Sequence, residues 1–334
     1  MRVLQIANYS ERGGGISVQV RLIRDHLAAG GTACDIVSTK GPFRDRMTAI
    51  GRLLFKGRRY DVFHVHACSG KGFFPAVVGI GIGRLLRRRI VFTYHGGGAE
   101  AFFLRKTRLV RFFISRTDVN VVLSEFIGKI YRQYGFPYTV IPNIVELKET
   151  YFRERETIKP RFVSIRSFYD IYNIECTLRA FRKVKMTFPD ASLLLLGDGP
   201  LRKDLECFVR EQQIKDVTFV GKVQNEDIYQ YLAQTDIMVS SSRFDNMPVS
   251  VLEGFNAGLL VIASRVGGVP FMIRDGENGL LFEDDNDDDL ARKMEYALEN
   301  PDKVREMITC ARQDLKHYSW DDCRSQLMRV YIGE

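Results

Sequence analysis

Features that mark several common protein classes are missing from this sequence of 334 residues. Its six cysteines include no C-x-x-C pair, which predicts reduced thiols and argues against a metal cluster. The sequence opens on a strand pattern at residues 2–7, so we expect no signal peptide. The longest apolar stretch, residues 73–83, is too short and too rich in glycine to span a bilayer. We therefore expect a cytoplasmic protein, soluble or at most peripheral on the inner face of the cell membrane.

Signature motifs for nucleotides and nucleic acids are absent as well. No Walker lysine motif occurs, so the sequence gives no support to ATP hydrolysis. The glycines after the first strand do not have the G-x-G-x-x-G spacing of a dinucleotide fingerprint. The net charge is +8, but no recognised nucleic-acid-binding motif accompanies the basic residues. We therefore expect no nucleic-acid partner.

The positive charge is concentrated in the first half of the chain. Residues 1–150 carry a net charge of +14, and the remainder carries −6. Basic clusters occur at 84–89 and 105–116, and apolar residues alternate with the charges in the second cluster. This mixture suits an anionic membrane surface. An ordinary helix with one core face and one solvated face explains it equally well.

Strand patterns alternate with helix patterns along the whole chain, which predicts an α/β protein with parallel sheets covered on both faces. A charged stretch at about 145–160 lacks a core pattern, and we interpret it as the connection between two domains. The expected domains cover 1–147 and 148–318. The expected strands lie at 2–7, 61–66, 90–94, 119–123 and 139–141, and then at 162–165, 193–196, 217–220, 236–239, 259–263 and 280–282.

Glycines and histidines are the candidate ligand contacts of the first domain. The glycines at 13–15 lie between a strand and a helix, where they either let a ligand approach the backbone or form a simple tight turn. His95 ends a strand beside a glycine run, where open α/β sheets bind ligands; the alternative is a loop histidine without a role. His64 and His66 share one face of a strand. They are conceivable as a zinc pair, but no third ligand is apparent.

Carboxylates and a helix start are the candidates of the second domain. Asp245 lies just before a helix that Pro248 opens, and such a start attracts an anion such as a phosphate. Glu253 lies inside this mostly apolar helix. With Arg166 and glycine backbone, these groups fit a nucleotide diphosphate between two sheets. The acidic run at 283–289 is explained by helix capping, with a divalent-metal site as the sharper alternative.

At this point the chain resembles a known family over essentially its whole length. The region 240–282 is similar to the donor-binding region of the large retaining glycosyltransferase family with the GT-B fold, two Rossmann-like domains facing across a cleft. The E-x7-E signature of that family usually reads Glu-Gly-Phe-Pro and then Glu-Ala-Met-Ala. The corresponding segments here are Asp245-Asn246-Met247-Pro248 and Glu253-Gly254-Phe255-Asn256.

The resemblance implies roles for individual residues. Glu253 would bind the ribose hydroxyls, Asp245 the hydroxyls of the donor sugar, and Arg166 the diphosphate leaving group. His95 would touch the sugar near the anomeric carbon. The first domain would bind the acceptor and be completed by a final helix at about 319–334, and the second would bind the donor. Further donor-binding positions would be Gly14, Gly15, Gly197, Lys222, Asn246, Met247 and Val249.

The implied function is transfer of a sugar from a nucleotide diphosphate sugar to a lipid-linked or cell-surface polysaccharide acceptor, with retention and without a metal or other cofactor. Acceptor contacts are expected in loops around 40–60 and 96–108. One departure matters most: the family usually has a lysine a few residues after the arginine, whereas here none follows Arg166 until Lys183. Lys222 is a candidate substitute. The alternatives are a non-catalytic protein that binds a sugar nucleotide or a partner transferase and, less favoured, a sugar-nucleotide hydrolase or epimerase.

Overall fold

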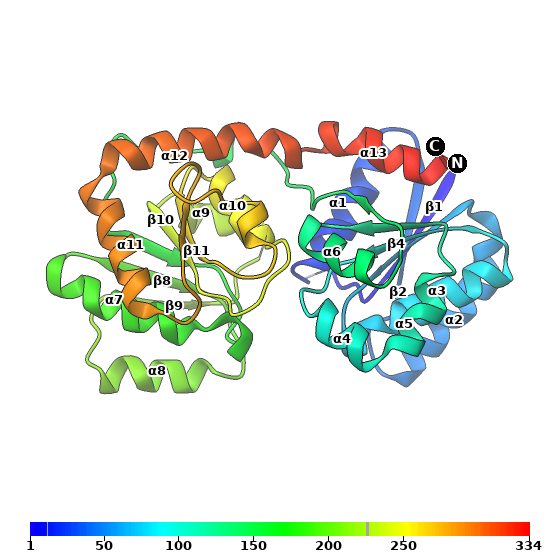
Figure 1. Cartoon of the computed structure of the whole chain (residues 1–334), viewed down its shortest axis with the longest axis horizontal. Coiled ribbons are helices and arrows are strands. Elements are labelled where there is room, and N and C mark those ends of the chain that lie inside the picture. The colour runs from blue at the N-terminus through cyan, green and yellow to red at the C-terminus, as the bar shows by residue number, and fades with distance from the viewer. Residues whose placement is uncertain (12, 225–226) are drawn as a thin grey trace. The chain divides into compact units, whose positions relative to one another are not determined.

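The computed structural model describes residues 1–11, 13–224 and 227–334. The chain divides into two compact units (Figure 1). The first unit combines Met1–Glu146 with Tyr318–Glu334, so both termini belong to it, and the second is Leu147–His317. Each unit contains one six-stranded sheet whose strands are all parallel, which confirms the predicted α/β fold.

The sheet of the first unit has the order β2-β1-β3-β4-β5-β6. Its strands are β1 (Arg2–Ala7), β2 (Ala33–Ser38), β3 (Val62–Ala67), β4 (Arg89–Tyr94), β5 (Val119–Val122) and β6 (Thr139–Val140). Its helices are α1 (Ile16–Ala29), α2 (Phe43–Lys56), α3 (Phe74–Leu85), α4 (Ala99–Arg105), α5 (Thr107–Ile114), α6 (Glu125–Gln133) and α13 (Trp320–Ile332). Sequence patterns did not identify the edge strand β2, and the segments expected as loops near 40–60 and 96–108 are largely the helices α2, α4 and α5.

The sheet of the second unit has the order β12-β11-β10-β7-β8-β9. Its strands are β7 (Arg161–Ser164), β8 (Ser192–Leu196), β9 (Val217–Gly221), β10 (Ile237–Ser240), β11 (Leu260–Ser264) and β12 (Leu280–Phe282). Its helices are α7 (Ile174–Thr187), α8 (Arg202–Glu211), α9 (Ile228–Leu232), α10 (Val249–Asn256), α11 (Asp287–Glu299) and α12 (Pro301–Asp314).

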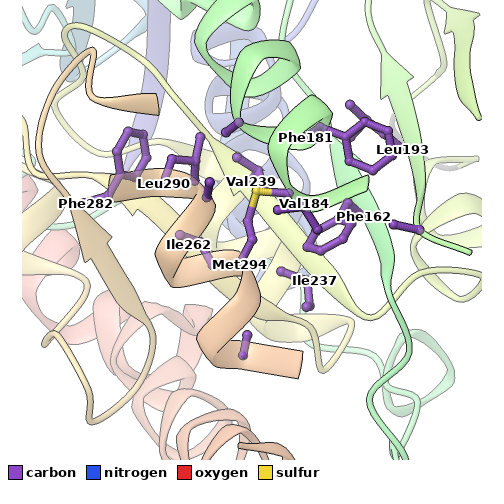
Figure 2. Packing of buried hydrophobic residues seen from close by; sticks show 14 of the residues in the cluster. Phe162, Phe181, Val184, Leu193, Ile237, Val239, Ile262, Phe282, Leu290 and Met294 are labelled. Carbon is purple, nitrogen blue, oxygen red and sulfur yellow. The ribbon is translucent and has the colours of Figure 1, made fainter. Parts of the chain in front are cut away.

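Strand side chains and covering helices form the core of the second unit (Figure 2). Phe162 and Ile237 of neighbouring strands pack with Phe181 of α7. On the same side of the sheet, Leu290 and Met294 of α11 are fully buried. Strands buried on both faces read as continuous apolar runs, which explains why these strands were predictable from sequence.

The stretch near 145–160 differs from the sequence expectation because one of its charges belongs to the core. The Arg155 side chain is buried and donates to the carbonyl oxygens of Thr235 at 3.0 and 2.8 Å, Ala257 at 2.7 Å and Gly258 at 2.8 Å. It also lies 3.4 Å from the buried carboxylate of Asp236. Burial lowers the pKa of Arg155 to about 10, so it stays charged at neutral pH. Arg155 therefore ties the carboxyl end of α10 to the rest of the second unit.

Strand order locates a possible binding crevice in each unit. In doubly wound sheets, ligands bind outside the carboxyl ends of the strands where the chain changes direction across the sheet. This switch lies between β7 and β10 in the second unit and between β1 and β3 in the first. Arg166 follows β7 and Asp245 follows β10, whereas the glycines at 13–15 follow β1.

Candidate functional site

An ion pair occupies the switch point of the second unit. Arg166 Nη2 lies 2.7 Å from Asp245 Oδ2, and the two side chains are only 10% and 18% exposed. The guanidinium also donates to Ser240 Oγ at 3.2–3.3 Å and lies 5.2 Å from the ring centre of Tyr172. Sequence reasoning named Arg166 and Asp245 but missed Ser240 and Tyr172. The signals for these two were a serine ending β10 and an aromatic residue shortly after the arginine.

The loop that carries Asp245 is held by close backbone contacts. Asp245 Oδ1 accepts from the backbone N–H of Asn246 at 2.9 Å, and the Asp245 carbonyl accepts from Gly268 N at 3.0 Å. Gly267 has φ +51°, and a Cβ there would lie 2.0 Å from the Asp245 carbonyl oxygen. A side chain at Gly267 is thus excluded both by conformation and by space. The glycine pair at 267–268 positions Asp245.

Helix α10 begins directly after this loop, and no side chain of the described residues caps its start. Pro248 is the N-cap residue, so the helix begins at Val249, one residue later than predicted. The hydroxyl of Ser250 is buried without a hydrogen-bond partner within 1–11, 13–224 and 227–334. Helix N-terminal N–H groups carry partial positive charge. The start of α10 therefore offers donors that suit an anion, with Asn246 and Met247 buried beside it.

Glu253 is half-buried on α10. Burial raises the pKa of its carboxyl to about 7, and the positive charge of Arg166 opposes this rise. An ionised carboxylate in such a place gains from hydrogen-bond donors supplied by a ligand. Glu253 is therefore a carboxyl group suited to accept from hydroxyl groups.

Other predicted positions lie along the same edge of the second sheet. Gly197 follows β8, and a Cβ there would lie 2.0 Å from the carbonyl oxygen of Arg166, so this glycine is required by packing of the chain itself. Lys222 is exposed directly after β9. Lys183 is not at this edge: it lies on α7, with its Nζ 2.6 Å from Asp287 Oδ2. Lys183 therefore does not replace the lysine that the family pattern has after the arginine.

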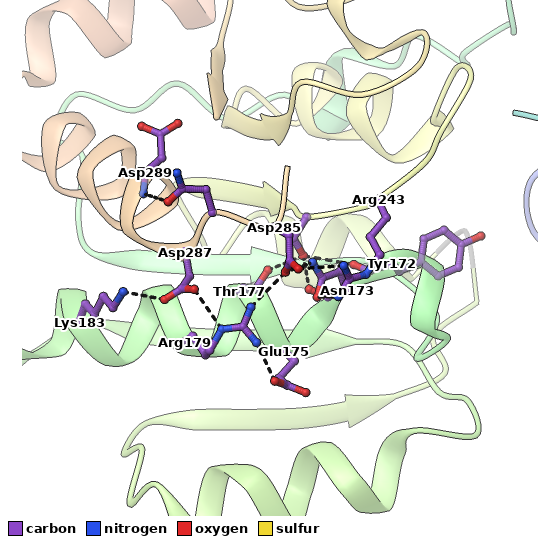
Figure 3. A network of polar contacts seen from close by, with 12 residues as sticks. Tyr172, Asn173, Glu175, Thr177, Arg179, Lys183, Arg243, Asp285, Asp287 and Asp289 are labelled. Carbon is purple, nitrogen blue, oxygen red and sulfur yellow. Dashed lines mark hydrogen bonds and ion pairs between the residues drawn. The ribbon is translucent and has the colours of Figure 1, made fainter. Parts of the chain in front are cut away.

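The acidic run at 283–289 is engaged by cations and by capping (Figure 3). Asn286 accepts from the N–H of Asp289 at 2.9 Å and caps α11. Arg179 lies 3.1 Å from Asp285 and 3.0 Å from Asp287. This arrangement agrees with the capping explanation. Within the described ranges, no group of three or more His, Cys, Asp or Glu side chains is placed to hold a metal ion.

The three glycines of the first unit differ in what requires them. A Cβ at Gly13 would lie 2.4 Å from Ser17 Oγ, and Gly15 has φ +51°. Gly14 needs neither explanation, since a Cβ there would meet no atom of the described chain within 4 Å. The turn therefore accounts for Gly13 and Gly15 but not for Gly14.

Three histidines of the first unit lie next to one another: His64 and His66 are buried, and His95 is partly buried. His64 and His66 lie on one face of β3 with ring centres 4.0 Å apart, as their spacing predicted. His64 is hydrogen-bonded to Tyr331 and Thr93, each at 2.7 Å. His66 is hydrogen-bonded to Gln5 and His95, each at 3.0 Å. Every nitrogen of the β3 pair is engaged by protein. The zinc-pair interpretation therefore finds no free ligand nitrogen on these two rings.

Burial keeps these imidazoles neutral. It lowers the pKa of His64 and of His95 to about 3 and that of His66 well below its usual value. His95 lies at the carboxyl end of β4, where its backbone N–H donates to the Ala67 carbonyl at 2.9 Å. At neutral pH, His95 can accept or donate hydrogen bonds but carries no charge.

The last helix, α13, completes the first unit. Ser319 caps it by accepting from Asp322 N at 3.2 Å, and Trp320 stacks on His26 with ring centres 4.9 Å apart. Its apolar side packs with Val3 and Ile23 in one buried cluster. Among the residues that the structure describes, none of the helices is both long and apolar enough to cross a membrane.

Comparison with known proteins supports one family. The profile described as "Glycosyltransferase Family 4" matches residues 42–149, and that described as "Glycosyl transferases group 1" matches residues 149–314. An uncharacterized glycosyltransferase of Methanocaldococcus jannaschii is 24% identical over 84% of this chain and 78% of its own length. The N-acetyl-alpha-D-glucosaminyl L-malate synthase of Bacillus anthracis is 26% identical over 81% of this chain and 74% of its own.

Solved structures agree on the fold. HepE of Anabaena in complex with UDP superposes over 100% of both chains with a TM-score of 0.79 at 15% sequence identity. The sucrose-phosphate synthase of Thermosynechococcus elongatus covers 99% of this chain and 98% of its own, with a TM-score of 0.82 at 20% identity. The chain is a glycosyltransferase of the family 4 type with the GT-B fold.

Proposed function

We propose that the chain transfers a sugar from a nucleotide diphosphate sugar to a glycan or lipid-linked acceptor, with retention of anomeric configuration and without a metal. The observation that carries the proposal is the Arg166–Asp245 pair at the switch point, next to the uncapped start of α10. HepE, which shares the fold, has been solved with UDP and with UDP-glucose. A nucleotide sugar is the ligand class that uses cations, helix N–H groups and carboxylates together.

The donor diphosphate would bind at the start of α10. The backbone N–H groups of Val249 and Ser250 in the first turn of α10 and the free hydroxyl of Ser250 supply donors there. Arg166 and Lys222 supply positive charge. Because Asp245 is already paired with Arg166, its carboxylate is poorly placed as a metal ligand, and we propose that the protein's own cations balance the diphosphate.

The reaction would proceed on one face of the sugar. The bond between the anomeric carbon and the phosphate oxygen breaks, and the acceptor hydroxyl oxygen forms the new bond from the same side. The hydroxyl proton passes to the departing phosphate oxygen. Arg166 would stabilise the charge that develops on that phosphate, the kind of electrostatic effect that dominates many enzymes.

A donor panel tests this function. The protein is incubated with UDP-, GDP- and ADP-sugars, and nucleotide release and thermal shift are recorded. We expect one member of the panel to raise the melting temperature and to turn over. A chain that neither binds nor converts any of them would lack the proposed activity.

A second candidate function, a non-catalytic sugar-nucleotide-binding or partner protein, is favoured by one observation. The stretch after Arg166 contains no lysine, and Lys183 is occupied by Asp287 on α11. One cation fewer would weaken leaving-group stabilisation more than ground-state binding. Donor binding without turnover, in the presence of any acceptor extract, would favour this candidate.

Gly14→Ala should separate ligand contact from folding. The added methyl group meets open space in the unliganded protein, so we expect a melting temperature unchanged or slightly raised. If donor phosphates approach this backbone, the methyl group should weaken donor affinity by about tenfold or more. Calorimetric titration checks this. Equal donor affinity in wild type and Gly14→Ala would remove Gly14 from the site.

Donor affinity should fall in acid because of Glu253. Its free carboxyl has a raised pKa of about 7, and ribose hydroxyls would donate to the ionised form, so binding requires loss of a proton below that pH. Between pH 8 and pH 6 we expect roughly tenfold weaker binding. Glu253→Gln should bind more weakly at pH 8 and show little pH dependence over this window. A wild-type affinity that is flat from pH 8 to 6 would contradict the ribose role.

We also propose an anionic lipid surface as a partner of the first unit. On α4 and α5, Leu104, Leu109 and Phe112 are exposed among basic residues, and the Arg116 guanidinium lies 3.7 Å from the ring centre of Phe112. Basic residues and exposed apolar side chains together favour the interface of an anionic bilayer. Exposed phenylalanines, Phe43 and Phe55, also lie on α2, and α3 contacts both α2 and α5 (Figure 1).

Vesicle flotation tests this partner. We expect the protein to float with vesicles that contain phosphatidylglycerol, less so at high salt, and not with pure phosphatidylcholine. Leu104→Ser with Phe112→Ser should reduce flotation, whereas Met186→Ser, an exposed apolar residue of α7 in the second unit, should not. The proposal would be contradicted if flotation did not fall at high salt and if Leu104→Ser with Phe112→Ser floated as well as Met186→Ser and the wild type.

A further inference from the structure

The buried polar chain behind His95 fixes which of its nitrogens carries the proton. The chain runs from the Val20 carbonyl on α1 through Gln5 of β1 and His66 of β3 to His95 at the end of β4. Gln5, His66 and the Val20 backbone are buried, so solvent cannot exchange for these partners. Once the donor of the hydrogen bond between Gln5 and Val20 is known, the donor of each following hydrogen bond can be worked out in turn.

The first direction is set by the backbone. Gln5 Nε2 lies 2.8 Å from the Val20 carbonyl oxygen and 3.4 Å from Cys34 Sγ. A carbonyl oxygen only accepts, so the amide nitrogen of Gln5 must face it, and Gln5 Oε1 must face His66. His66 Nε2, 3.0 Å from that oxygen, is therefore the N–H donor.

The remaining directions follow from neutrality. Because burial depresses the pKa of both imidazoles, each ring carries one N–H. His66 uses its proton at Nε2, so its Nδ1 accepts, and the donor must be His95 Nε2, 3.0 Å away. This leaves Nδ1 of His95 without a proton.

We infer that Gln5 and His66 are positioning residues that hold His95 in the Nε2–H tautomer, so that its Nδ1 presents a hydrogen-bond acceptor to a hydroxyl of the ligand. The ligand class is thus a donor of O–H, such as a sugar hydroxyl. This inference rests on the proposed function for the identity of the ligand, but the tautomer itself depends only on the three contacts and on both rings being neutral. It gives a role to Gln5, a buried polar residue between the apolar Leu4 and Ile6 of β1.

Nitrogen NMR on protein labelled with ¹⁵N-histidine tests the inference, with the five histidines assigned by single substitutions. In the unliganded wild type we expect His95 and His66 each to show a protonated Nε2 and a bare Nδ1. A protonated Nδ1 on His95 would overturn the inference, and once the signals are assigned this measurement on the wild type needs no nucleotide.

Gln5→Glu should reverse the donor and acceptor of the hydrogen bond between His66 and His95. A carboxylate beside His66 favours the imidazolium, which donates from both nitrogens, so His95 Nε2 must accept and its proton must move to Nδ1. If this variant does not fold, Gln5→Met removes the fixed direction without adding a charge and should give a mixture of tautomers. Tyr331→Phe is the matched control. It removes a hydrogen-bond partner of His64 but leaves the contacts of Gln5, His66 and His95 in place, so His95 should keep its tautomer. An unchanged His95 in a folded Gln5 variant would overturn the inference.

Titration with UDP-glucose and UDP supplies the functional readout. We expect Gln5→Glu to bind UDP-glucose about tenfold more weakly than wild type does, while its affinity for UDP, which lacks the sugar, stays within about twofold. Equal losses for both ligands would indicate a structural effect and overturn the positioning role. A wild-type chain that binds neither excludes a uridine nucleotide as the donor; the same pair of titrations is then made with the nucleotide sugar that the donor panel selects and its nucleoside diphosphate, and the NMR result still decides the tautomer.

Discussion

Arg166→Ala should lower kcat by about 10² to 10³ while the protein stays folded. The guanidinium is the strongest donor at the switch point of the second sheet, and it is the group that would balance the leaving diphosphate. Its loss also leaves Asp245, only 18% exposed, without its counterion, so electrostatic repulsion of the diphosphate increases. Steady-state nucleotide release with the selected donor measures the effect. Arg166→Lys, which keeps the charge but loses the fork of donors, should recover part of the rate.

Arg161→Ala is the matched control for this change. Arg161 begins the same strand β7, at its amino end, and pairs with the buried Asp236 at 2.6 Å. Its removal breaks an ion pair of similar geometry without touching the carboxyl edge of the sheet. We expect some loss of stability and a kcat within about twofold of wild type. If Arg161→Ala lowers kcat as much as Arg166→Ala does, the effect of Arg166 is not local to the proposed site.

Arg155→Ala should destabilise the second unit by about 3–5 kcal/mol. The change removes the guanidinium donors that now serve the carbonyl groups of Thr235, Ala257 and Gly258, although the Ala257 carbonyl keeps the backbone N–H of Arg153 at 3.3 Å. Within the described residues it also leaves the buried carboxylate of Asp236 with Arg161 as its remaining cation. Buried acceptors that lose their donors cost their full desolvation. For a unit of this size the loss corresponds to a melting temperature lower by roughly 10 °C in scanning calorimetry.

The same substitution at an exposed arginine is the control. Arg292 on α11 has a 65% exposed side chain and one ion pair with Asp289, so Arg292→Ala should change stability by no more than about 0.5 kcal/mol. An Arg155→Ala melting temperature equal to that of Arg292→Ala would contradict the structural role of Arg155.

The regular elements of the fold could be predicted from the sequence because buried positions carry apolar residues, which recur in the pattern typical of a strand or of a helix. The strands β7, β10 and β11 are buried on both faces and read as apolar runs. The edge strand β2 was missed because its side chains are mostly half-exposed and include Asp35. Arg155 was misread because a charge in a polar stretch looks solvated, and only the fold reveals the carbonyl groups that surround it.

In the candidate site, too, some residues could be predicted from the sequence and others could not. Asp245 and Glu253 could be named from one local segment, since a loop, a helix start and an internal acid are close in sequence. The partners Ser240 and Tyr172 come from separate elements that the topology brings to Arg166, so spacing along the chain could not identify them. The direction of the hydrogen bonds at His95 depends on Gln5, 90 residues earlier in the sequence.

Calorimetric titration of a panel of UDP-, GDP- and ADP-sugars into wild type and Glu253→Ala tests most directly whether the carboxyl edge of the second sheet is the donor site. We expect one nucleotide sugar to bind the wild type, and Glu253→Ala to bind it at least tenfold more weakly while keeping the wild-type melting temperature or exceeding it, because a carboxyl with a burial-raised pKa destabilises the free protein when ionised. Equal affinity in the two proteins, or no binding by the wild type, would contradict this assignment.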